Sequence, residues 1–350
     1  MDTIKVGSVG GRGGSIWEEE GDELVGIFVS YGEDIVYSLQ FLNYVNGKLH
    51  MSAKYGTQHC EMYGAIILNY PSEFLTSISG SSERINKKLT ILRSIIFCTN
   101  KGSYGTFGTP STDGNNIDFN FVIGNYQFFG GFHGTDNCNG IESIGFYVKN
   151  ISSSHVIKLK DSPVKMLFSP LFCKSEMIKV GPVGSNCGSI WEENGRSKVA
   201  GIFVSYTENR IQSLQFLFYE NGNFVQSNKY GSPHSENFCA LVFDYPSEFL
   251  TSISGSYIGD GYLSSTGLDA IKLNTNKDSY GPFGRTEPSS SSKQFNFQLG
   301  NYDLFGGFHG TMSPSAVESI GIYVKPVVSS MNKLKGGSLK GGSLRVKDKK

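Results

Sequence analysis

Adjacent carboxylates are the residues in this chain whose types most readily suggest catalysis. Glu18-Glu19-Glu20 and Glu192-Glu193 supply acids of the kind that glycosidases place on either side of a glycosidic bond. Neighbouring residues on a β-strand point to opposite faces, and nothing in the sequence marks one carboxyl as an acid with a raised pKa. The pattern therefore does not favour catalysis at either acidic run.

Two histidines, His133 and His309, lie in two copies of the motif GFHG and could serve metal binding or proton transfer. No second histidine or cysteine stands at metal-ligand spacing from either one. We predict structural histidines whose rings hydrogen-bond to nearby backbone.

The six cysteines form no C-x-x-C pair, so a zinc site is disfavoured. None has a counterpart in the other copy of the repeat described below, which argues against a shared disulfide framework. We expect free thiols at Cys60, Cys98, Cys138, Cys173, Cys187 and Cys239.

A third candidate is a loop with fixed ends and a variable centre. It reads FGGFHGTDNCNGIESIG over Phe129–Gly145 and FGGFHGTMSPSAVESIG over Phe305–Gly321. The flanks FGGFHG and ESIG are identical, but DNCNGI is replaced by MSPSAV. A rigid frame that carries a variable tip is typical of a binding loop held by two strands.

The elements that position this loop belong to a tandem repeat. The motifs IKVG, GSIWEE, GIFVSY, SLQF, KYG, YPSEFLTSISG, FNF, GNY and YVK occur twice in the same order. The spacing between partner motifs changes by only about two residues along the unit, so the chain is a duplication. We predict domains over residues 1–149 and 177–326, a linker over 150–176 and a basic tail over 327–350.

Both copies predict an all-β fold. GIFVSY and ESIGFYVK are short apolar and aromatic runs bounded by glycine. FLTSISG alternates Phe74, Thr76 and Ile78 against Leu75, Ser77 and Ser79, as in a half-buried strand. Asn46-Gly47 and Asn221-Gly222 are expected to form hairpin turns, because Asn and Gly tolerate positive φ. Lys87–Phe97 comes nearest to a helical pattern, but its partner in the second copy is typical of a strand.

Composition narrows the possible partners. The 350 residues carry a formal net charge of zero, so no global field attracts nucleic acid. The first residues lack a secretory signal pattern, and no apolar run approaches the length of a membrane span. We expect a soluble cytoplasmic protein, with nuclear entry through the basic tail as an open alternative. The apolar linker segment Met166–Cys173 is expected to pack against a neighbouring domain or to dock a partner.

Taken together, the motifs resemble those of the jacalin-related lectins. VGSVGGRGGSIWEE, YPSEFLTSISG and GFHG…ESIG-x-YV carry the resemblance, which covers roughly residues 3–149 and 177–326. The most similar variety is the plant multi-repeat type to which myrosinase-binding proteins belong. The resemblance implies two tandem β-prisms, each of three four-stranded antiparallel sheets. It also implies binding of mannose/glucose-type or galactose-type sugars without a metal, a cofactor or enzymatic activity.

The same resemblance implies where a sugar would bind. A glycine that ends a G-G-x-G-G run lets the backbone approach the sugar, and it corresponds to Gly14 and Gly188. The family pattern then has an aspartate before the I-G of the last strand, whereas this chain has Glu142 and Glu318. The backbone amides that would contact the sugar belong to Asn139, Gly140, Ser315 and Ala316.

The glutamates leave three interpretations open. A glutamate places its carboxylate roughly 1.5 Å further out than an aspartate, while acceptable O–H···O distances span only about 0.5 Å. The glutamates bind sugar with an altered preference, or sugar binding is lost, or the carboxylates only cap loop amides. Tyr257, expected in a loop beside the sugar, could stack on a pyranose ring or simply pack on the surface.

The sequence thus predicts a non-enzymatic lectin for mannose/glucose-type glycans or glycoproteins. Its single sites would be weak and would gain avidity from the tandem repeat and from any homo-oligomer. The alternative is an adaptor that holds other proteins, for example those of a glycosidase complex, with little sugar affinity. Neither nucleic acid nor a membrane is expected as a partner.

Overall fold

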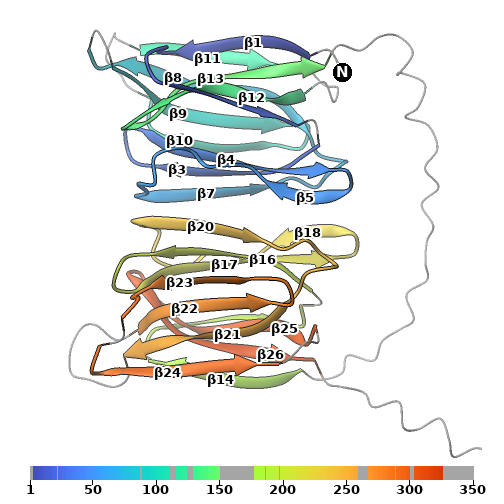
Figure 1. Cartoon of the computed structure of the whole chain (residues 1–350), viewed down its shortest axis with the longest axis vertical. Coiled ribbons are helices and arrows are strands. Elements are labelled where there is room, and N and C mark those ends of the chain that lie inside the picture. Colours follow the sequence, from blue (N-terminus) through green and yellow to red (C-terminus); the bar gives the residue numbers. More distant parts are fainter. Residues whose placement is uncertain are drawn as a thin grey trace, which may run out of the picture.

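The computed structural model describes residues 3–21, 23–86, 89–110, 116–123, 129–149, 177–185, 187–196, 198–258, 267–287, 289–299 and 303–325. These residues form two stacked β-prisms (Figure 1). No described segment is a helix of the length and apolarity needed to cross a membrane. The apolar segment Met166–Cys173 and the basic tail lie outside the described residues.

Each prism is built from thirteen strands. The first prism contains β1 (Thr3–Gly10), β2 (Ser15–Glu20), β3 (Leu24–Tyr31), β4 (Val36–Val45), β5 (Lys48–Met51), β6 (Tyr55–Gly56), β7 (Met62–Ile67), β8 (Leu75–Arg84), β9 (Thr90–Thr99), β10 (Ser103–Gly108), β11 (Asn116–Val122), β12 (Phe129–Asn137) and β13 (Gly140–Lys149). The second prism contains β14 (Ile178–Gly184), β15 (Ser189–Asn194), β16 (Val199–Tyr206), β17 (Ile211–Glu220), β18 (Asn223–Gln226), β19 (Tyr230–Gly231), β20 (Asn237–Val242), β21 (Leu250–Ile258), β22 (Gly267–Thr275), β23 (Ser279–Gly284), β24 (Ser292–Gln298), β25 (Phe305–Ser313) and β26 (Ala316–Val324).

The strands of each prism form three antiparallel sheets. The first prism has the orders β1-β13-β12-β2, β5-β4-β3-β7 and β10-β9-β8-β11, with the short β6 beside β4. The second prism has β14-β26-β25-β15, β18-β17-β16-β20 and β23-β22-β21-β24, with β19 beside β17. The prediction of an all-β fold with three four-stranded sheets per copy is confirmed, and the ambiguous segment Lys87–Phe97 contributes to β9.

Each prism encloses its own aromatic core where its three sheets meet. The rings of Phe41 and Phe132 stack with centroids 4.3 Å apart in the first core. Phe216 and Phe308 do the same at 4.2 Å in the second. Burying a side chain of this size contributes about 1.5–3 kcal/mol. The FGGFHG motif therefore supplies a core aromatic to each prism as well as a strand that leads to the variable loop.

The two Asn-Gly pairs form hairpin turns as predicted. Asn46 and Gly47 join β4 to β5 with φ angles of 53° and 76°. Asn221 and Gly222 join β17 to β18 with φ angles of 51° and 85°. Positive φ at both positions is the type I′ geometry that matches the twist of paired strands.

The simple alternation predicted for FLTSISG is wrong. Leu75 and Ile78 are both buried, although they were expected on opposite faces. The register of β8 against β9 shifts between Leu75 and Ser77. A β-bulge inserts one extra residue and thereby reverses the alternation of side chains along a strand.

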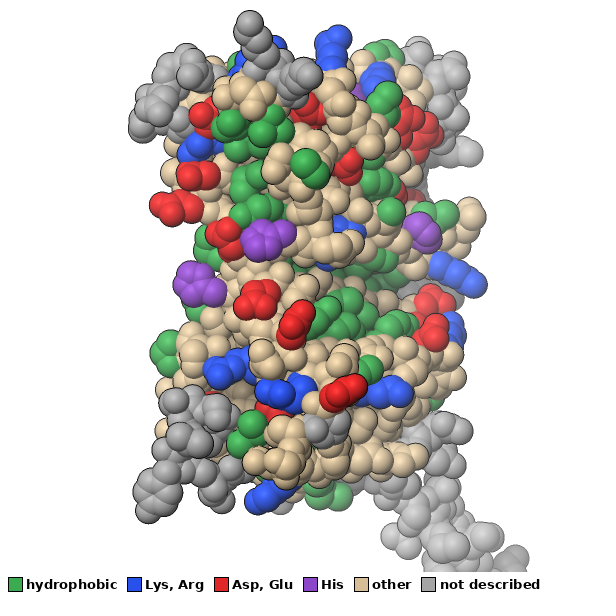
Figure 2. Space-filling view, turned by 60° about the vertical axis from the view of Figure 1, so that its left-hand side comes forward, with side chains coloured by type: hydrophobic (Ala, Val, Ile, Leu, Met, Phe, Trp, Pro, Cys, Tyr) green, Lys and Arg blue, Asp and Glu red, His purple; other side chains and the backbone are tan. Residues whose placement is uncertain are grey.

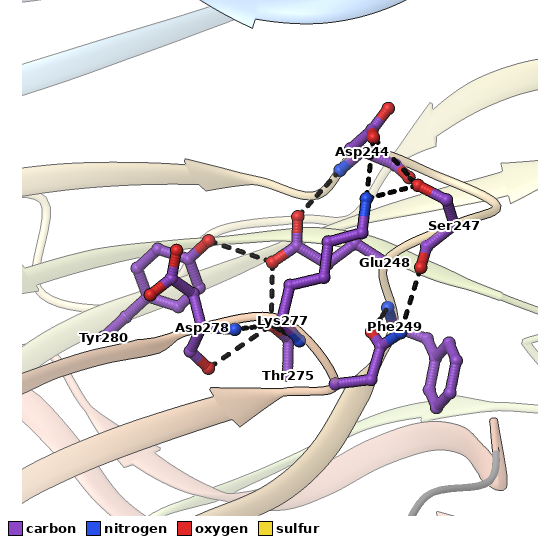
Figure 3. A network of polar contacts seen from close by, with 9 residues as sticks. Asp244, Ser247, Glu248, Phe249, Thr275, Lys277, Asp278 and Tyr280 are labelled. Carbon is purple, nitrogen blue, oxygen red and sulfur yellow. Dashed lines mark hydrogen bonds and ion pairs between the residues drawn. The ribbon is translucent and has the colours of Figure 1, made fainter.

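The recurring YPSEF motif forms a polar network at one end of each prism. Glu248 accepts hydrogen bonds from Thr275 Oγ1 at 2.7 Å, Tyr280 OH at 2.9 Å and Asp244 N at 3.1 Å (Figure 3). Glu73 makes the equivalent contacts in the first prism. The carboxylate ties the turn before β21 to the β22–β23 turn, so the motif recurs for a structural reason.

The two prisms pack against each other through one sheet from each. Val25, Phe28 and Tyr63 of the first prism meet Phe203 and Phe238 of the second in a continuous apolar cluster. The Tyr63 and Phe238 rings stack with centroids 3.9 Å apart. This interface was not predicted, and it explains why GIFVSY is buried on both faces of its strand.

Two partly buried lysines complete this interface with approximate two-fold symmetry. Lys54 Nζ donates to Phe238 O at 3.0 Å, and Lys229 Nζ donates to Tyr63 O at 2.8 Å. Lys229 Nζ also lies 3.5 Å from the centre of the Tyr63 ring. Burial lowers the pKa of both lysines, that of Lys229 to about 8.

The interface orients corresponding ends of the two prisms in the same direction. Met62, at the start of β7, forms a β-bridge with His234, and Ser235 N donates to Glu61 O at 2.5 Å. Both segments lie at the prism end where β3 and β16 finish. In Figure 1 these ends, which also hold the β1–β2 and β14–β15 connections, face left.

Candidate functional site

The candidate site of the first prism lies where the β1–β2 connection meets the β12–β13 hairpin. Gly10 pairs with Ser143, and Ser15 pairs with Asp136, so the two loops are neighbours. Glu142 occupies a register shift between these pairs, because Thr135 faces Ser143 while Asp136 faces Ile141. A β-bulge re-aims the side chain of the extra residue. The bulge places the Glu142 carboxylate within reach of the glycine-rich loop.

In the first prism this carboxylate is enclosed by the glycine run. Glu142 is 2% exposed. Its Oε2 accepts a hydrogen bond from Gly14 N at 2.7 Å, and its Oε1 accepts one from Gly13 N at 3.3 Å. A methyl group on Gly11 would lie 2.2 Å from Oε1. The amide of Gly14, expected to face a sugar, is therefore bonded to the protein's own carboxylate.

The second prism arranges the same two loops differently. Ser185 replaces the glycine at the position of Gly11, and its Oγ accepts a hydrogen bond from Cys187 N at 3.4 Å. Glu318 is 8% exposed and sits at the equivalent bulge. Among the described residues, its Oε2 has no hydrogen-bond partner. Gly188 is adjacent, since a methyl group there would lie 2.5 Å from this oxygen.

Both loop glycines are also required by packing. A methyl group on Gly14 would lie 1.9 Å from Asp136 O, and one on Gly188 would lie 2.3 Å from Met312 O. No side chain fits at either distance. The glycines therefore allow the loops to approach the adjacent strand, and this packing role does not depend on a ligand.

The amides expected at the hairpin tips are mostly engaged within the turns. Asn139 N donates to Asn137 Oδ1 at 2.9 Å, and Ser315 N donates to Ser313 Oγ at 3.4 Å. Gly140 and Ala316 are buried and close their hairpins by pairing with Asn137 and Ser313. The structure thus brings these residues to the site without showing a free donor at Asn139.

Tyr257 does not lie in a loop, contrary to the expectation. It belongs to β21, where it pairs with Leu268 and Lys293. Its half-buried ring packs against the core, with its centroid 6.4 Å from that of Phe295. The strand continues beyond SISG because β24 pairs with it as far as Ile258, which gives Tyr257 the packing role that was its alternative.

The two GFHG histidines are structural, as predicted. His133 Nε2 lies 3.1 Å from Val6 O, and His309 Nε2 lies 3.1 Å from Val180 O. Both rings are buried, and burial lowers the pKa of each. No group of three potential metal ligands occurs in the part of the chain that the structure describes.

The acidic runs form ion pairs on the surface. Glu18 Oε1 lies 2.5 Å from Lys5 Nζ, and Glu192 Oε1 lies 2.8 Å from Lys179 Nζ. The hydrogen bond from Lys5 lowers the pKa of Glu18. Glu19 instead accepts a hydrogen bond from Tyr55 OH at 2.7 Å. Glu18, Glu19 and Glu192 therefore each have a partner within the chain.

Sequence reasoning missed one feature of this end of the second prism. A cavity with a volume of about 50 Å³ lies beside the β25–β26 turn and is lined by Arg210, Arg285, Asp269 and Ala316, among others. Both arginines interrupt the repeat, since Ile35 and Thr109 occupy their positions in the first copy. A comparison of charges between the copies could have found them.

Comparisons with known proteins found a matching family model and several similar proteins. The model of the jacalin-like lectin domain matches residues 6–147 and 180–323. The protein RESTRICTED TEV MOVEMENT 1 of Arabidopsis thaliana is 36% identical over 155 residues, which are 43% of this chain and 87% of that protein. PYK10-binding protein 1 of the same plant is 25% identical over 92% of this chain and 98% of its own length. The mannose-binding lectin from Champedak is 26% identical, with a TM-score of 0.38 over 43% of this chain and 99% of its own.

Proposed function

The chain belongs to the jacalin-like lectin domain family, whose members bind carbohydrate without catalysis, and from this membership we propose that its second prism carries the main sugar site. The ligand class is a mannose/glucose-type glycan. The site consists of Glu318 and the loop around Gly188. The first prism contributes a weaker site at Glu142 and Gly14.

One observation carries this proposal: Glu318 Oε2 is buried and unpaired among the described residues. A buried acceptor without a donor destabilises a protein by about 1–3 kcal/mol, and by more when it is charged. A sugar hydroxyl can donate to such an oxygen and accept from a neighbouring amide at the same time. A glycan bound here would therefore supply the donor that the chain does not.

The corresponding carboxylate of the first prism, that of Glu142, already has hydrogen-bond donors. Glu142 already accepts hydrogen bonds from Gly13 and Gly14. A hydrogen bond to a charged group stabilises by roughly 1.5–3 kcal/mol. A sugar would have to replace these bonds before it gained any of its own, so we expect weaker binding.

The prism ends that carry Glu142 and Glu318 lie on the same side of the molecule (Figure 1). Two sites on one side can contact the same surface of clustered glycans together. The second contact is then intramolecular and raises the apparent affinity. The tandem arrangement thus supports avidity even when the first site is weak.

A glycan array tests the proposal with the variants Glu318→Gln and Glu142→Gln. Glutamine keeps the size of the side chain but removes the charge and half of its acceptor capacity. We expect wild type to bind mannose- or glucose-containing glycans, Glu318→Gln to lose most of this signal and Glu142→Gln to keep most of it. If the wild-type protein bound no glycan on the array, the proposal would be wrong.

The second candidate function is a protein-binding adaptor. Two observations favour it: the first-prism carboxylate is already satisfied, and the chain aligns along 92% of its length with a relative named for binding PYK10. The test is binding of purified PYK10 before and after its glycans are removed enzymatically. Binding that survives deglycosylation supports the adaptor, and binding that disappears with the glycans supports the lectin.

A further inference from the structure

The cavity beside the β25–β26 turn of the second prism has the features of an anion site. Its volume of about 50 Å³ exceeds the 10–15 Å³ that one water needs, so it can hold a group of several atoms. Arg210 comes from the β16–β17 loop, and Arg285 directly follows β23. Two arginines and one acid, Asp269, line the cavity, which leaves an excess of positive charge.

The arginines are not neutralised by the chain around them. Arg285 Nε is buried without an acceptor among the described residues. Asp269 is buried, and its Oδ2 accepts a hydrogen bond from Ser292 Oγ at 2.7 Å. No described acid lies within ion-pairing distance of Arg210 or Arg285, whereas Arg196 of the same prism pairs with two acids, Glu193 and Glu220. A buried cationic N–H without a partner calls for an acceptor from outside.

The first prism fills the equivalent region with its own charges. Arg93 stands where the second prism has Asp269, and it forms ion pairs with Glu83 and Asp34. The second prism has Ile258 and Asn209 in place of those two acids. One cation and two anions in the first prism thus become two cations and one anion in the second. Figure 2 turns the left-hand side of Figure 1 toward the viewer, and it shows a band of Lys and Arg across the second prism.

The cavity adjoins the candidate sugar site. Ala316 lines the cavity and begins the strand that carries Glu318. Gly267, at another wall, is so close that a methyl group on it would lie 3.9 Å from the Cα of Glu318. One wall of the cavity therefore lies next to the backbone that carries Glu318.

We propose that the second prism binds acidic glycans, with sugar hydroxyls on Glu318 and a carboxylate or sulfate substituent on Arg210 and Arg285. The inference rests on the sugar site proposed above and adds the class of its ligand. Each part of the site has one unsatisfied atom. Glu318 Oε2 lacks a donor, which a sugar hydroxyl would supply, and Arg285 Nε lacks an acceptor, which the acidic substituent would supply. Guanidinium groups suit carboxylate and sulfate because their N–H groups lie in one plane and can bind two oxygens.

Matched sugars that differ only at C6 test this directly. Methyl glucoside is compared with methyl glucuronide, and methyl mannoside with methyl mannuronide, by calorimetry on the full chain. We expect wild type to bind the uronides about tenfold more tightly, which corresponds to about 1.4 kcal/mol. The double variant Arg210→Gln/Arg285→Gln should lose this preference and keep its affinity for the neutral sugars. Arg84→Gln, which removes an exposed arginine at the same end of the first prism, is the matched control and should behave as wild type.

The outcomes separate this inference from the function on which it rests. Binding of neutral sugars without any preference for uronides would overturn the acidic-glycan site and leave the lectin. Binding of neither class would remove both. A preference that survives the double variant, with folding verified by its melting temperature, would also overturn the inference. Inorganic sulfate should displace the uronides but not the neutral sugars, and its failure to do so would place the anion elsewhere.

Discussion

At the scale of single residues, two equivalent glutamates differ because of their neighbours. Gly11 leaves room for the Glu142 carboxylate to turn into the loop, where Gly13 and Gly14 donate to it. Ser185 occupies the position of Gly11 in the second prism, and Glu318 Oε2 remains unpaired there among the described residues. The Glu142 carboxylate thus caps two loop amides in the first prism, whereas Glu318 of the second prism retains an unpaired oxygen.

A glycine explains why GFHG and ESIG recur together. A methyl group on Gly145 would lie 2.4 Å from His133 Cε1, and one on Gly321 would lie 2.3 Å from His309 Cε1. Each ring is fixed by its hydrogen bond to a β1 or β14 carbonyl and cannot move aside. We expect Gly145→Ala to lower the free energy of unfolding by about 1–3 kcal/mol, as overpacking does.

Urea denaturation measures this effect. Gly102→Ala is the control, because nothing lies within 4 Å of a methyl group at that turn, and it should change stability by less than about 0.5 kcal/mol. If Gly145→Ala unfolded at the same urea concentration as wild type, the steric account of the paired motifs would be wrong.

At the scale of elements, the turns opposite the candidate site stabilise the prism. Glu248 accepts three hydrogen bonds there, and glutamine offers one of their donors an N–H instead of an acceptor. We expect Glu248→Gln to destabilise the protein by about 1–3 kcal/mol. Sugar binding should be unchanged in the folded variant, because the network lies at the other end of the strands.

Thermal unfolding and calorimetry on the same sample check both parts of this prediction. Asp278→Asn is a suitable control, since only the backbone of Asp278 joins the network through Thr275. A loss of sugar affinity in folded Glu248→Gln would contradict the separation of the stabilising end from the binding end.

The sequence predicts those elements that local chemistry determines. Asn46-Gly47 needs positive φ, so its hairpin follows from two residue types. The bulges at Leu75 and at Glu142 do not follow, because they depend on the register of the partner strand. The bulge decides where the Glu142 carboxylate points, and this is why the fold was predicted but the state of the site was not. The same holds for Tyr257, whose strand is extended by its pairing with β24.

At the scale of the whole molecule, the interface between the prisms is the feature that sequence reasoning missed. Phe28 and Phe203 meet across it with ring centroids 5.1 Å apart. The runs GIFVSY contained a signal, since a strand with one exposed face would alternate, and these do not. Packing through these sheets holds both candidate sites toward one side.

The partly buried lysines Lys54 and Lys229 make this interface sensitive to pH. The pKa of Lys229 is about 8 in the folded protein and near 10.5 when exposed. Between these values the unfolded chain holds more protons than the folded one, so stability rises as pH increases. Below pH 8 the folded protein carries the full desolvation penalty of the charged Lys229 ammonium group. We expect the Lys229 contribution to stability to increase from pH 8 to pH 10 by at most about 1.4 kcal/mol per pH unit.

The measurement compares wild type with Lys229→Met over this pH range. Methionine fills similar space without a charge, and the difference between the two proteins cancels the titration of groups that do not interact with Lys229. The free energy of unfolding of wild type relative to the variant should rise with pH. A difference that stays constant from pH 8 to pH 10 would show that folding does not lower the pKa of Lys229.

The central claim is that the second prism holds the main sugar site at Glu318. Isothermal titration of the full chain with the tightest neutral glycan from the array tests it most directly. The account predicts one dominant site per chain, lost in Glu318→Gln and retained in Glu142→Gln. Two equal sites per chain, or a dominant site that disappears with Glu142→Gln, would contradict it.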